Sequence, residues 1–148
     1  MGETQQYCLK WNNYQTSLSS SFKDLLANEA FVDCTLTCGE AGAGRTLQAH
    51  RVVLSACSPY FRQVTKLTTQ PLNVTAMLCS QVLSNLTQWQ HPVIILKDVK
   101  YEDLSGIIEF IYHGEVSIDQ ECLPGFLQAA ESLRIKGLTE DKKVVFVF

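Results

Sequence analysis

The sequence predicts an α+β fold, and three observations support that class. Short segments with alternating apolar and polar residues are typical of strands, whereas longer segments with apolar residues at helical spacing are typical of amphipathic helices. The chain has 148 residues, of which 46% are hydrophobic, enough for one compact core without disulfides or metals. The sequence contains no Gly-rich phosphate loop and no strand-to-helix nucleophile elbow.

The N-terminal part of the chain predicts a strand, a helix and a hairpin. A short strand is expected from Tyr7 to Trp11, followed by Asn12 and Asn13 as a helix cap. The helix of about four turns carries one apolar stripe, made of Leu18, Phe22, Leu25 and Leu26. Alternation over residues 32–38 predicts a strand, and a loose turn at residues 39–44 leads to a returning strand over 45–50.

The remaining elements are predicted from prolines, glycines and apolar spacing. A helix from Arg51 should stop at Cys57 because Ser58 precedes Pro59, and the same pair should start the next helix. The apolar run at residues 93–96 is predicted to be a strand buried on both faces. Apolar residues from 104 to 111 predict a helix that ends at Gly114, and Pro124 starts the last helix.

Charge and composition argue against several functional classes. The 12 basic and 15 acidic residues are interspersed and give a net charge of -3, so no basic stripe is available for a phosphate backbone. We therefore expect no direct binding of nucleic acid by this chain. A signal segment and a run of about eighteen apolar residues are also absent from the sequence, so we expect a soluble intracellular protein without membrane contact.

The six cysteines and three histidines do not form a recognisable metal or catalytic pattern. Cys34 and Cys38 would lie about 13 Å apart on one strand face, too far for a disulfide, so buried free thiols are expected. His50, His91 and His113 are scattered without partners at metal-ligand spacing. We expect no catalytic residue, no metal and no cofactor, and hence no enzyme.

Several blocks, in order along the chain, resemble the BTB/POZ domains of the insect tramtrack, bric-a-brac and broad-complex group. The blocks are residues 7–14, Asp33 with residues 50–61, and residues 91–99, 110–116 and 130–138. The resemblance implies a BTB/POZ domain over residues 1–140, with helical hairpins around a small sheet. It also implies a dimer in which the first strand and the first helix are exchanged between subunits.

The resemblance further implies which residues carry the function. The family's charged pocket at the dimer interface corresponds to Asp33 and Arg51, with His50 beside them. The exchanged strand and helix correspond to Cys8, Leu9, Trp11, Leu18 and Phe22. From the residues alone, Asp33 is also compatible with a solvent-facing position, and residues 7–11 with an ordinary edge strand that places Trp11 in the core.

The function implied is homo- and heterodimerisation, with assembly beyond the dimer in the tramtrack group, in a nuclear transcription regulator of development. The implied partners are the chain itself, related BTB proteins, and corepressors or chromatin proteins. The alternative use of this fold is a substrate adaptor for a cullin-type ubiquitin ligase. The sequence lacks zinc-finger spacing, so we expect a short isoform without its DNA-binding region.

Two segments depart from the family pattern. Residues 62–90 are longer than the usual connection, and we favour an unselected, splice-derived insert over an extra amphipathic helix that carries Leu78, Val82, Leu86 and Trp89. The extra length should cost under about 1 kcal/mol in loop closure. Residues 144–148, within a short tail that starts at 141, are apolar and β-prone, so they are expected to be an added edge strand with a tendency to aggregate.

Overall fold

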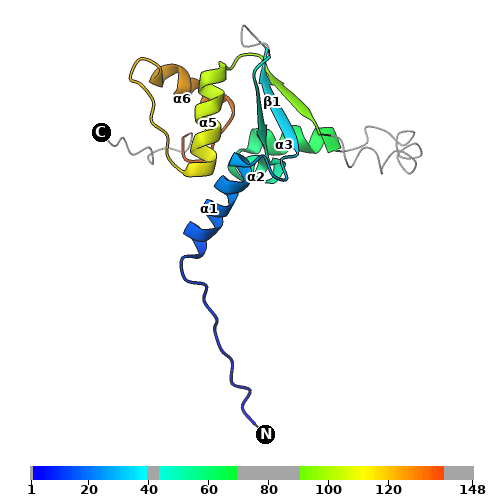
Figure 1. Cartoon of the computed structure of the whole chain (residues 1–148), viewed down its shortest axis with the longest axis vertical. Coiled ribbons are helices and arrows are strands. Elements are labelled where there is room, and N and C mark those ends of the chain that lie inside the picture. Colours follow the sequence, from blue (N-terminus) through cyan, green and yellow to red (C-terminus); the bar gives the residue numbers. More distant parts are fainter. Residues whose placement is uncertain (1, 40–43, 70–90, 139–148) are drawn as a thin grey trace, which may run out of the picture.

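The computed structural model describes residues 2–39, 44–69 and 91–138, which form a small sheet with helices packed beside it (Figure 1). The elements in chain order are α1 (Tyr14–Ala27), β1 (Cys34–Cys38), β2 (Thr46–Ala49), α2 (Arg51–Cys57), α3 (Pro59–Thr69), β3 (Val93–Leu96), α5 (Tyr101–His113) and α6 (Leu123–Ser132). The predicted α+β class is confirmed. Figure 1 shows α1 projecting from the body, with the N-terminal segment extended beyond it.

The sheet has three strands in the order β2-β1-β3. β1 and β2 form the predicted antiparallel hairpin, and β1 also pairs in parallel with β3, so that Leu36 lies between Leu47 and Ile94. One face of the sheet is buried against the helices in a single core cluster. That cluster includes Cys34, Leu36, Cys38, Ile94 and Leu96 from the strands and Leu54, Phe61, Leu104, Ile107 and Phe126 from the helices.

β3 corrects one prediction. Ile94 and Leu96 are buried as expected, but Val93 and Ile95 are each 60% exposed, so the strand is buried on one face only. The prediction was wrong because the apolar run was attributed to a strand with both faces covered, as in a parallel sheet between helices. Among the described residues β3 lies at the edge of the sheet, and their helical side chains cover only the face that carries Ile94 and Leu96.

The junction between α2 and α3 follows the Ser-Pro prediction. α2 ends at Cys57 and α3 begins at Pro59. The buried Ser58 hydroxyl accepts the Phe61 N–H at 3.1 Å and donates to the Leu133 carbonyl at 2.5 Å. Ser58 thus caps α3 and ties it to the end of α6.

α3 continues through Thr69 and therefore includes residues 62–69 of the segment predicted to be an insert. Thr65 in this part is buried, and its hydroxyl donates to the Phe61 carbonyl at 2.8 Å. The predictions for residues 70–90 and for the tail at 144–148 concern residues outside the described ranges.

α5 and α6 match their predicted spacing. α5 stops at Gly114, which adopts the left-handed conformation with φ 81°, and its N–H donates to the Phe110 carbonyl at 2.8 Å. The two helices approach closely at Gly106, since a Cβ atom built there would lie 3.0 Å from the ring of Phe126. This contact explains why a glycine is tolerated inside α5.

The N-terminal segment differs most from the prediction. Residues 7–11 form no strand within the chain, and Trp11 is exposed rather than part of the core. Within the described residues no other strand lies beside this segment, so its backbone has no partner for a ladder. Asn13 occupies the predicted cap position of α1, but its side chain makes no capping bond; its carbonyl accepts the Ser17 N–H at 2.8 Å.

Candidate functional site

Asp33 and Arg51 form an ion pair at the start of α2. Asp33 lies directly before β1, where its N–H donates to the Ala49 carbonyl at 3.1 Å. Its Oδ1 accepts the Arg51 backbone N–H at 2.7 Å, and its Oδ2 accepts the Arg51 Nε–H at 3.2 Å. The carboxylate therefore satisfies a free N–H in the first turn of α2, a role that the side chain of the N-cap residue His50 does not take.

The Asp33–Arg51 pair is only half-buried within one chain. The side chain of Arg51 is 25% exposed and that of Asp33 is 43% exposed. Water therefore screens the pair, and a contribution of about 1 kcal/mol is expected from it in a single chain. The larger cost of about 3–5 kcal/mol for breaking a buried pair applies only where another surface covers these side chains.

His50 turns the other way, into the core. Its Nε2 lies 2.8 Å from the Ala30 carbonyl, and its Nδ1 lies 2.7 Å from the Tyr112 hydroxyl. A carbonyl can only accept, so Nε2 carries a proton; in the neutral imidazole Nδ1 is then the acceptor of the Tyr112 O–H. The Tyr112 oxygen also accepts the His50 backbone N–H at 3.0 Å.

This network joins α5, the start of α2 and the loop before β1. Burial raises the pKa of Tyr112 to about 12, with its hydrogen bond to His50 acting in the opposite direction, so the hydroxyl keeps its proton and remains a donor. Both ring nitrogens of His50 are occupied by Ala30 and Tyr112. His50 is therefore a structural residue beside the charged pair, and its ring does not point into a pocket shared with Asp33.

Phe31 lies in the loop between α1 and β1, which His50 binds through the Ala30 carbonyl. Its φ is 61°, a left-handed conformation that is rare for a bulky residue, and it is 85% exposed. Before Phe31, the Ala30 N–H donates to the Leu25 carbonyl at 2.8 Å, and the Ala30 carbonyl accepts from His50. After Phe31, the Asp33 N–H donates to the Ala49 carbonyl. The exposed Val52 follows Arg51 in the first turn of α2.

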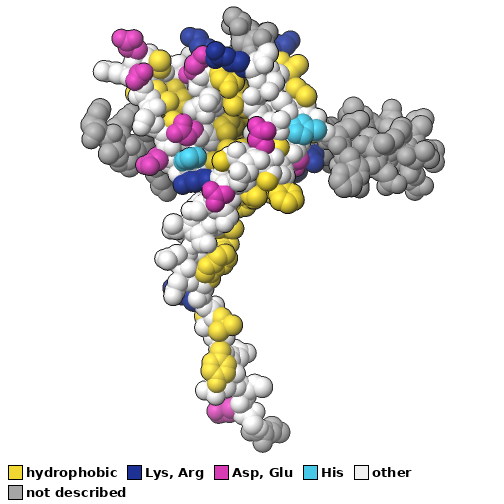
Figure 2. Space-filling view, in the orientation of Figure 1, with side chains coloured by type: hydrophobic (Ala, Val, Ile, Leu, Met, Phe, Trp, Pro, Cys, Tyr) yellow, Lys and Arg dark blue, Asp and Glu magenta, His cyan; other side chains and the backbone are white. Residues whose placement is uncertain are grey.

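The residues of the expected exchanged strand and helix are largely uncovered. Leu9 is 94% exposed; Cys8, Trp11 and Leu18 are also exposed, and Phe22 is half-buried against the core. α1 contains no buried residue, although it carries the predicted apolar stripe. Figure 2 shows hydrophobic side chains along one side of the projecting α1 and the N-terminal segment.

The described cysteines are free thiols, and not all of them are buried as expected. Cys34 and Cys38 are buried and Cys57 is half-buried, whereas Cys8 and Cys122 are exposed. Burial raises the pKa of the Cys34 thiol to about 12, with the Asp33 carboxylate acting in the same direction, and burial also raises the pKa of Cys38 and Cys57. Buried protonated thiols of this kind act as small apolar residues and are poor nucleophiles.

Within residues 2–39, 44–69 and 91–138, no group of three or more His, Cys, Asp or Glu side chains could hold a metal ion. The same residues contain no helix with the length and apolar character needed to span a bilayer. The described residues also carry two surface features: the exposed apolar residues and the half-buried charged pair.

Sequence reasoning missed Phe31, Val52 and Tyr112 as site residues. Phe31 and Val52 belong to no apolar stripe, and their exposure depends on how the loop and α2 are held. Tyr112 could have been noticed as a buried aromatic that needs a hydrogen-bond partner, but its distance of 62 residues from His50 gave no local signal.

Comparisons with known proteins agree with this arrangement. The family model described as "BTB/POZ domain" matches residues 22–145. Three of the relatives are proteins of Drosophila melanogaster. The chain is 49% identical to the Broad-complex core protein isoforms 1/2/3/4/5 and 46% identical to Longitudinals lacking protein isoforms A/B/D/L, each over 142 residues. It is 47% identical to protein tramtrack, alpha isoform, over 137 residues. These alignments cover 96%, 96% and 93% of the chain.

The chain spans 16%, 15% and 14% of the length of these relatives. Among solved structures, the BTB domain of zebrafish PATZ1 matches with a TM-score of 0.67 and 19% identity, covering 90% of this chain and 91% of the other. At that identity the match supports the fold alone.

Proposed function

The chain belongs to the BTB/POZ domain family, and we propose that it is a protein-interaction module in which two copies exchange their first strand and first helix. The observation that carries this proposal is the uncovered apolar N-terminal region. Tyr7, Leu9, Trp11, Tyr14 and Leu18 are all exposed in a single chain.

The stability of α1 supports a second copy as the missing surface. A helix of 14 residues is marginal in water unless a partner covers its apolar stripe. Only Phe22 and Leu26 of α1 contact the core, from half-buried positions at its C-terminal end. A second chain would supply the cover for the other end of α1 and a neighbouring strand for residues 7–11.

The charged pair fits the same interface. Each member of the pair has an exposed apolar residue close to it in sequence: Phe31 two residues before Asp33, and Val52 directly after Arg51. A partner that covers these four residues would bury the pair, and a buried pair that has lost one member is strongly unfavourable. Mispaired partners lacking the matching surface would then be disfavoured, which supports a role for Asp33 and Arg51 in selecting partners.

The biological setting is proposed from the relatives. High identity to the Broad-complex and tramtrack proteins supports a role in a nuclear transcription regulator of development. The partners we propose are the chain itself and related BTB proteins, with corepressors or chromatin proteins recruited by the assembled dimer. The net charge of -3 supports binding through protein surfaces rather than direct contact with DNA.

Sedimentation equilibrium between nanomolar and 100 micromolar protein tests the dimer. We expect at least twice the monomer mass of 16.6 kDa throughout the micromolar range, because obligate interfaces usually bury more than about 2,000 Å². Leu9→Lys with Leu18→Lys should shift the protein to monomer, whereas Gln120→Lys on the exposed loop before α6 should not. A folded wild-type monomer at micromolar concentration would refute the proposal.

A further inference from the structure

Asn13 has an unusual backbone conformation at the start of α1. Its φ of 62° and ψ of 31° lie in the left-handed region, which residues with a side chain rarely adopt, although asparagine does so more readily than most. A residue that caps a helix usually has extended backbone angles and a side chain that accepts an N–H from the first turn. Asn13 has neither feature, since its side chain makes no capping bond. Helix capping therefore does not explain this conformation, and strain of this kind is commonly kept for a function.

Two aromatic rings pack together across Asn13. The ring centroids of Trp11 and Tyr14 lie 5.2 Å apart with an angle of 68° between the planes, an edge-to-face arrangement that is favourable for aromatic pairs. Both side chains are otherwise exposed, so this contact does not belong to the core. The left-handed residue turns the chain between the two rings, and the aromatic contact stabilises that turn.

The length of α1 limits which strands residues 7–11 can reach. The 14 residues of α1 span about 21 Å, and the helix packs against the core through Phe22 and Leu26 in its C-terminal half. Five extended residues span only about 17 Å. After folding back along α1, residues 7–11 would have no length left to pair with a strand of their own sheet. Figure 1 shows the opposite course, with this segment running away from the sheet.

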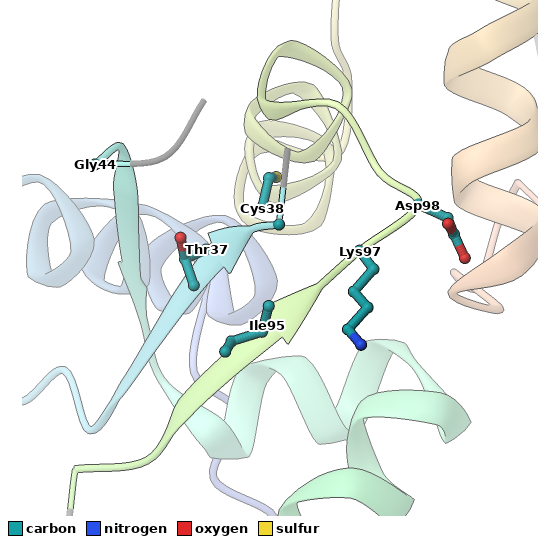
Figure 3. A pocket seen from close by; sticks show the side chains of 7 residues that line it. Thr37, Cys38, Gly44, Ile95, Lys97 and Asp98 are labelled. Atoms are coloured by element: carbon teal, nitrogen blue, oxygen red, sulfur yellow. The ribbon is translucent and has the colours of Figure 1, made fainter. Parts of the chain in front are cut away.

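The outer strands of the described sheet lie far from this segment. β2 and β3 are the outer strands, and both belong to the body from which α1 projects (Figure 1). At the end of β3, Ile95 and Lys97 line an open pocket with Thr37 of β1, and the described residues around this pocket all come from the sheet and its turns (Figure 3). A neighbouring strand for residues 7–11 therefore has to come from outside this sheet.

We propose that Asn13 is a positioning residue for strand exchange: its left-handed backbone directs residues 7–11 away from their own chain and toward the second copy. The proposal rests on the exchanged dimer proposed above and adds the residue that sets the direction of the exchanged strand. With a different residue at position 13, a free chain would relax to ordinary backbone angles, whereas the dimer would force that residue into the left-handed region. The penalty of such a substitution would therefore fall on the dimer and not on the single chain.

Substitutions of Asn13 distinguish positioning from capping. Glycine adopts the left-handed region without strain, whereas serine caps helices about as well as asparagine but avoids that region. The positioning role thus predicts that Asn13→Gly behaves as wild type and that Asn13→Ser is impaired, together with Asn13→Val, whose branched side chain is unfavourable at positive φ. A capping role predicts that Asn13→Ser behaves as wild type. Asn12→Val is the matched control, because Asn12 is not among the residues with positive φ.

Subunit exchange in the full chain measures the effect on association. Unlabelled and isotope-labelled chains of one variant are mixed, and the appearance of mixed dimers is followed by native mass spectrometry. Asn13→Ser and Asn13→Val should form mixed dimers at least about tenfold faster than wild type, because weaker association appears mainly as faster dissociation. Asn13→Gly and Asn12→Val should keep the wild-type rate.

Amide hydrogen exchange shows where each variant acts. In the wild-type dimer a neighbouring strand should protect residues 7–11, and in Asn13→Ser this protection should fall at least about tenfold while residues 14–17 keep theirs. Loss of a helix cap would instead expose the first turn of α1. The Ser17 N–H, which donates to the Asn13 carbonyl at 2.8 Å, reports on that turn.

The outcomes separate this proposal from the proposed dimer. A wild-type dimer in which every Asn13 variant exchanges at the wild-type rate would overturn the positioning role alone. Asn13→Ser at the wild-type rate, with Asn13→Gly faster, would overturn it in favour of a capping role. Asn12→Val as fast as Asn13→Val would also overturn it, since the backbone of residue 13 would then have no special effect. A wild-type chain that stays monomeric would refute the proposed dimer and the positioning role with it.

Discussion

His50 and Arg51 are adjacent in sequence, yet they lie in opposite environments. The His50 ring is buried, with both nitrogens bonded to groups of the same chain, whereas the Arg51 side chain pairs with Asp33 at a half-exposed surface. The buried side is complete within one chain. The outer side, with Phe31 and Val52, leaves apolar surface uncovered. The contrast separates the part of the domain that is fully bonded within one chain from the surface on which we propose that a partner binds.

The largest expected effect is a loss of folding stability at alkaline pH, because the groups that titrate there lie on the buried side. Burial raises the pKa of Cys34 from 9.0 to about 12 and that of Tyr112 from 10.0 to about 12. Between pH 9 and 12 the unfolded chain loses these protons while the native chain keeps them, so stability falls as pH rises. The Cys34 shift alone corresponds to about 4 kcal/mol across the whole window up to pH 12, of which about two-thirds is lost by pH 11. Urea unfolding from pH 8 to 11 should show the loss, and Cys34→Ala should reduce its slope.

Tyr112→Phe tests the hydrogen-bond network at neutral pH. The variant leaves the His50 Nδ1 and backbone N–H buried without their partner, which should cost about 3 kcal/mol. Urea denaturation at fixed protein concentration measures this loss. The mass of the folded protein should stay that of wild type; an unchanged free energy of unfolding would mean that the network does not hold the loop.

Phe31→Gly should separate stability from association. Glycine adopts φ 61° without strain, so the single chain should gain about 1 kcal/mol, since it loses only an exposed side chain. The proposed dimer should nevertheless dissociate at least about tenfold more readily, because an aromatic anchor is lost. Arg134→Gly is the matched control: φ there is 51°, and the variant should gain stability without weakening association. A Phe31→Gly dimer as tight as wild type would remove Phe31 from the interface.

Asp33→Asn gives the smallest expected effect in a single chain. The side-chain carbonyl can still accept the Arg51 N–H, and water screens the lost charge, so a decrease of about 1 kcal/mol is expected. If a partner covers the pair, the cost should rise toward about 3–5 kcal/mol. Unfolding measured below and above the concentration of dimer formation compares the two values, and equal costs would show that the pair stays exposed in the assembly.

Local signals in the sequence predicted most elements of the fold. Ser58-Pro59 marked the end of α2 and the start of α3, and Gly114 marked the end of α5, because proline and glycine restrict or permit backbone angles locally. The contact between Asp33 and Arg51 came from the family resemblance, and the structure brings these residues together.

Other features depend on which surfaces meet. The sequence by itself determined where most of the helices and strands begin, and where α2 and α5 end, because caps, turns and apolar spacing act over a few residues. The tertiary structure alone decided that β3 is exposed on one face, that residues 7–11 find no strand in their own chain, and that His50 reaches Tyr112. Burial and hydrogen bonding between residues far apart in sequence depend on how the elements pack, and the spacing of residues within one element does not predict that packing.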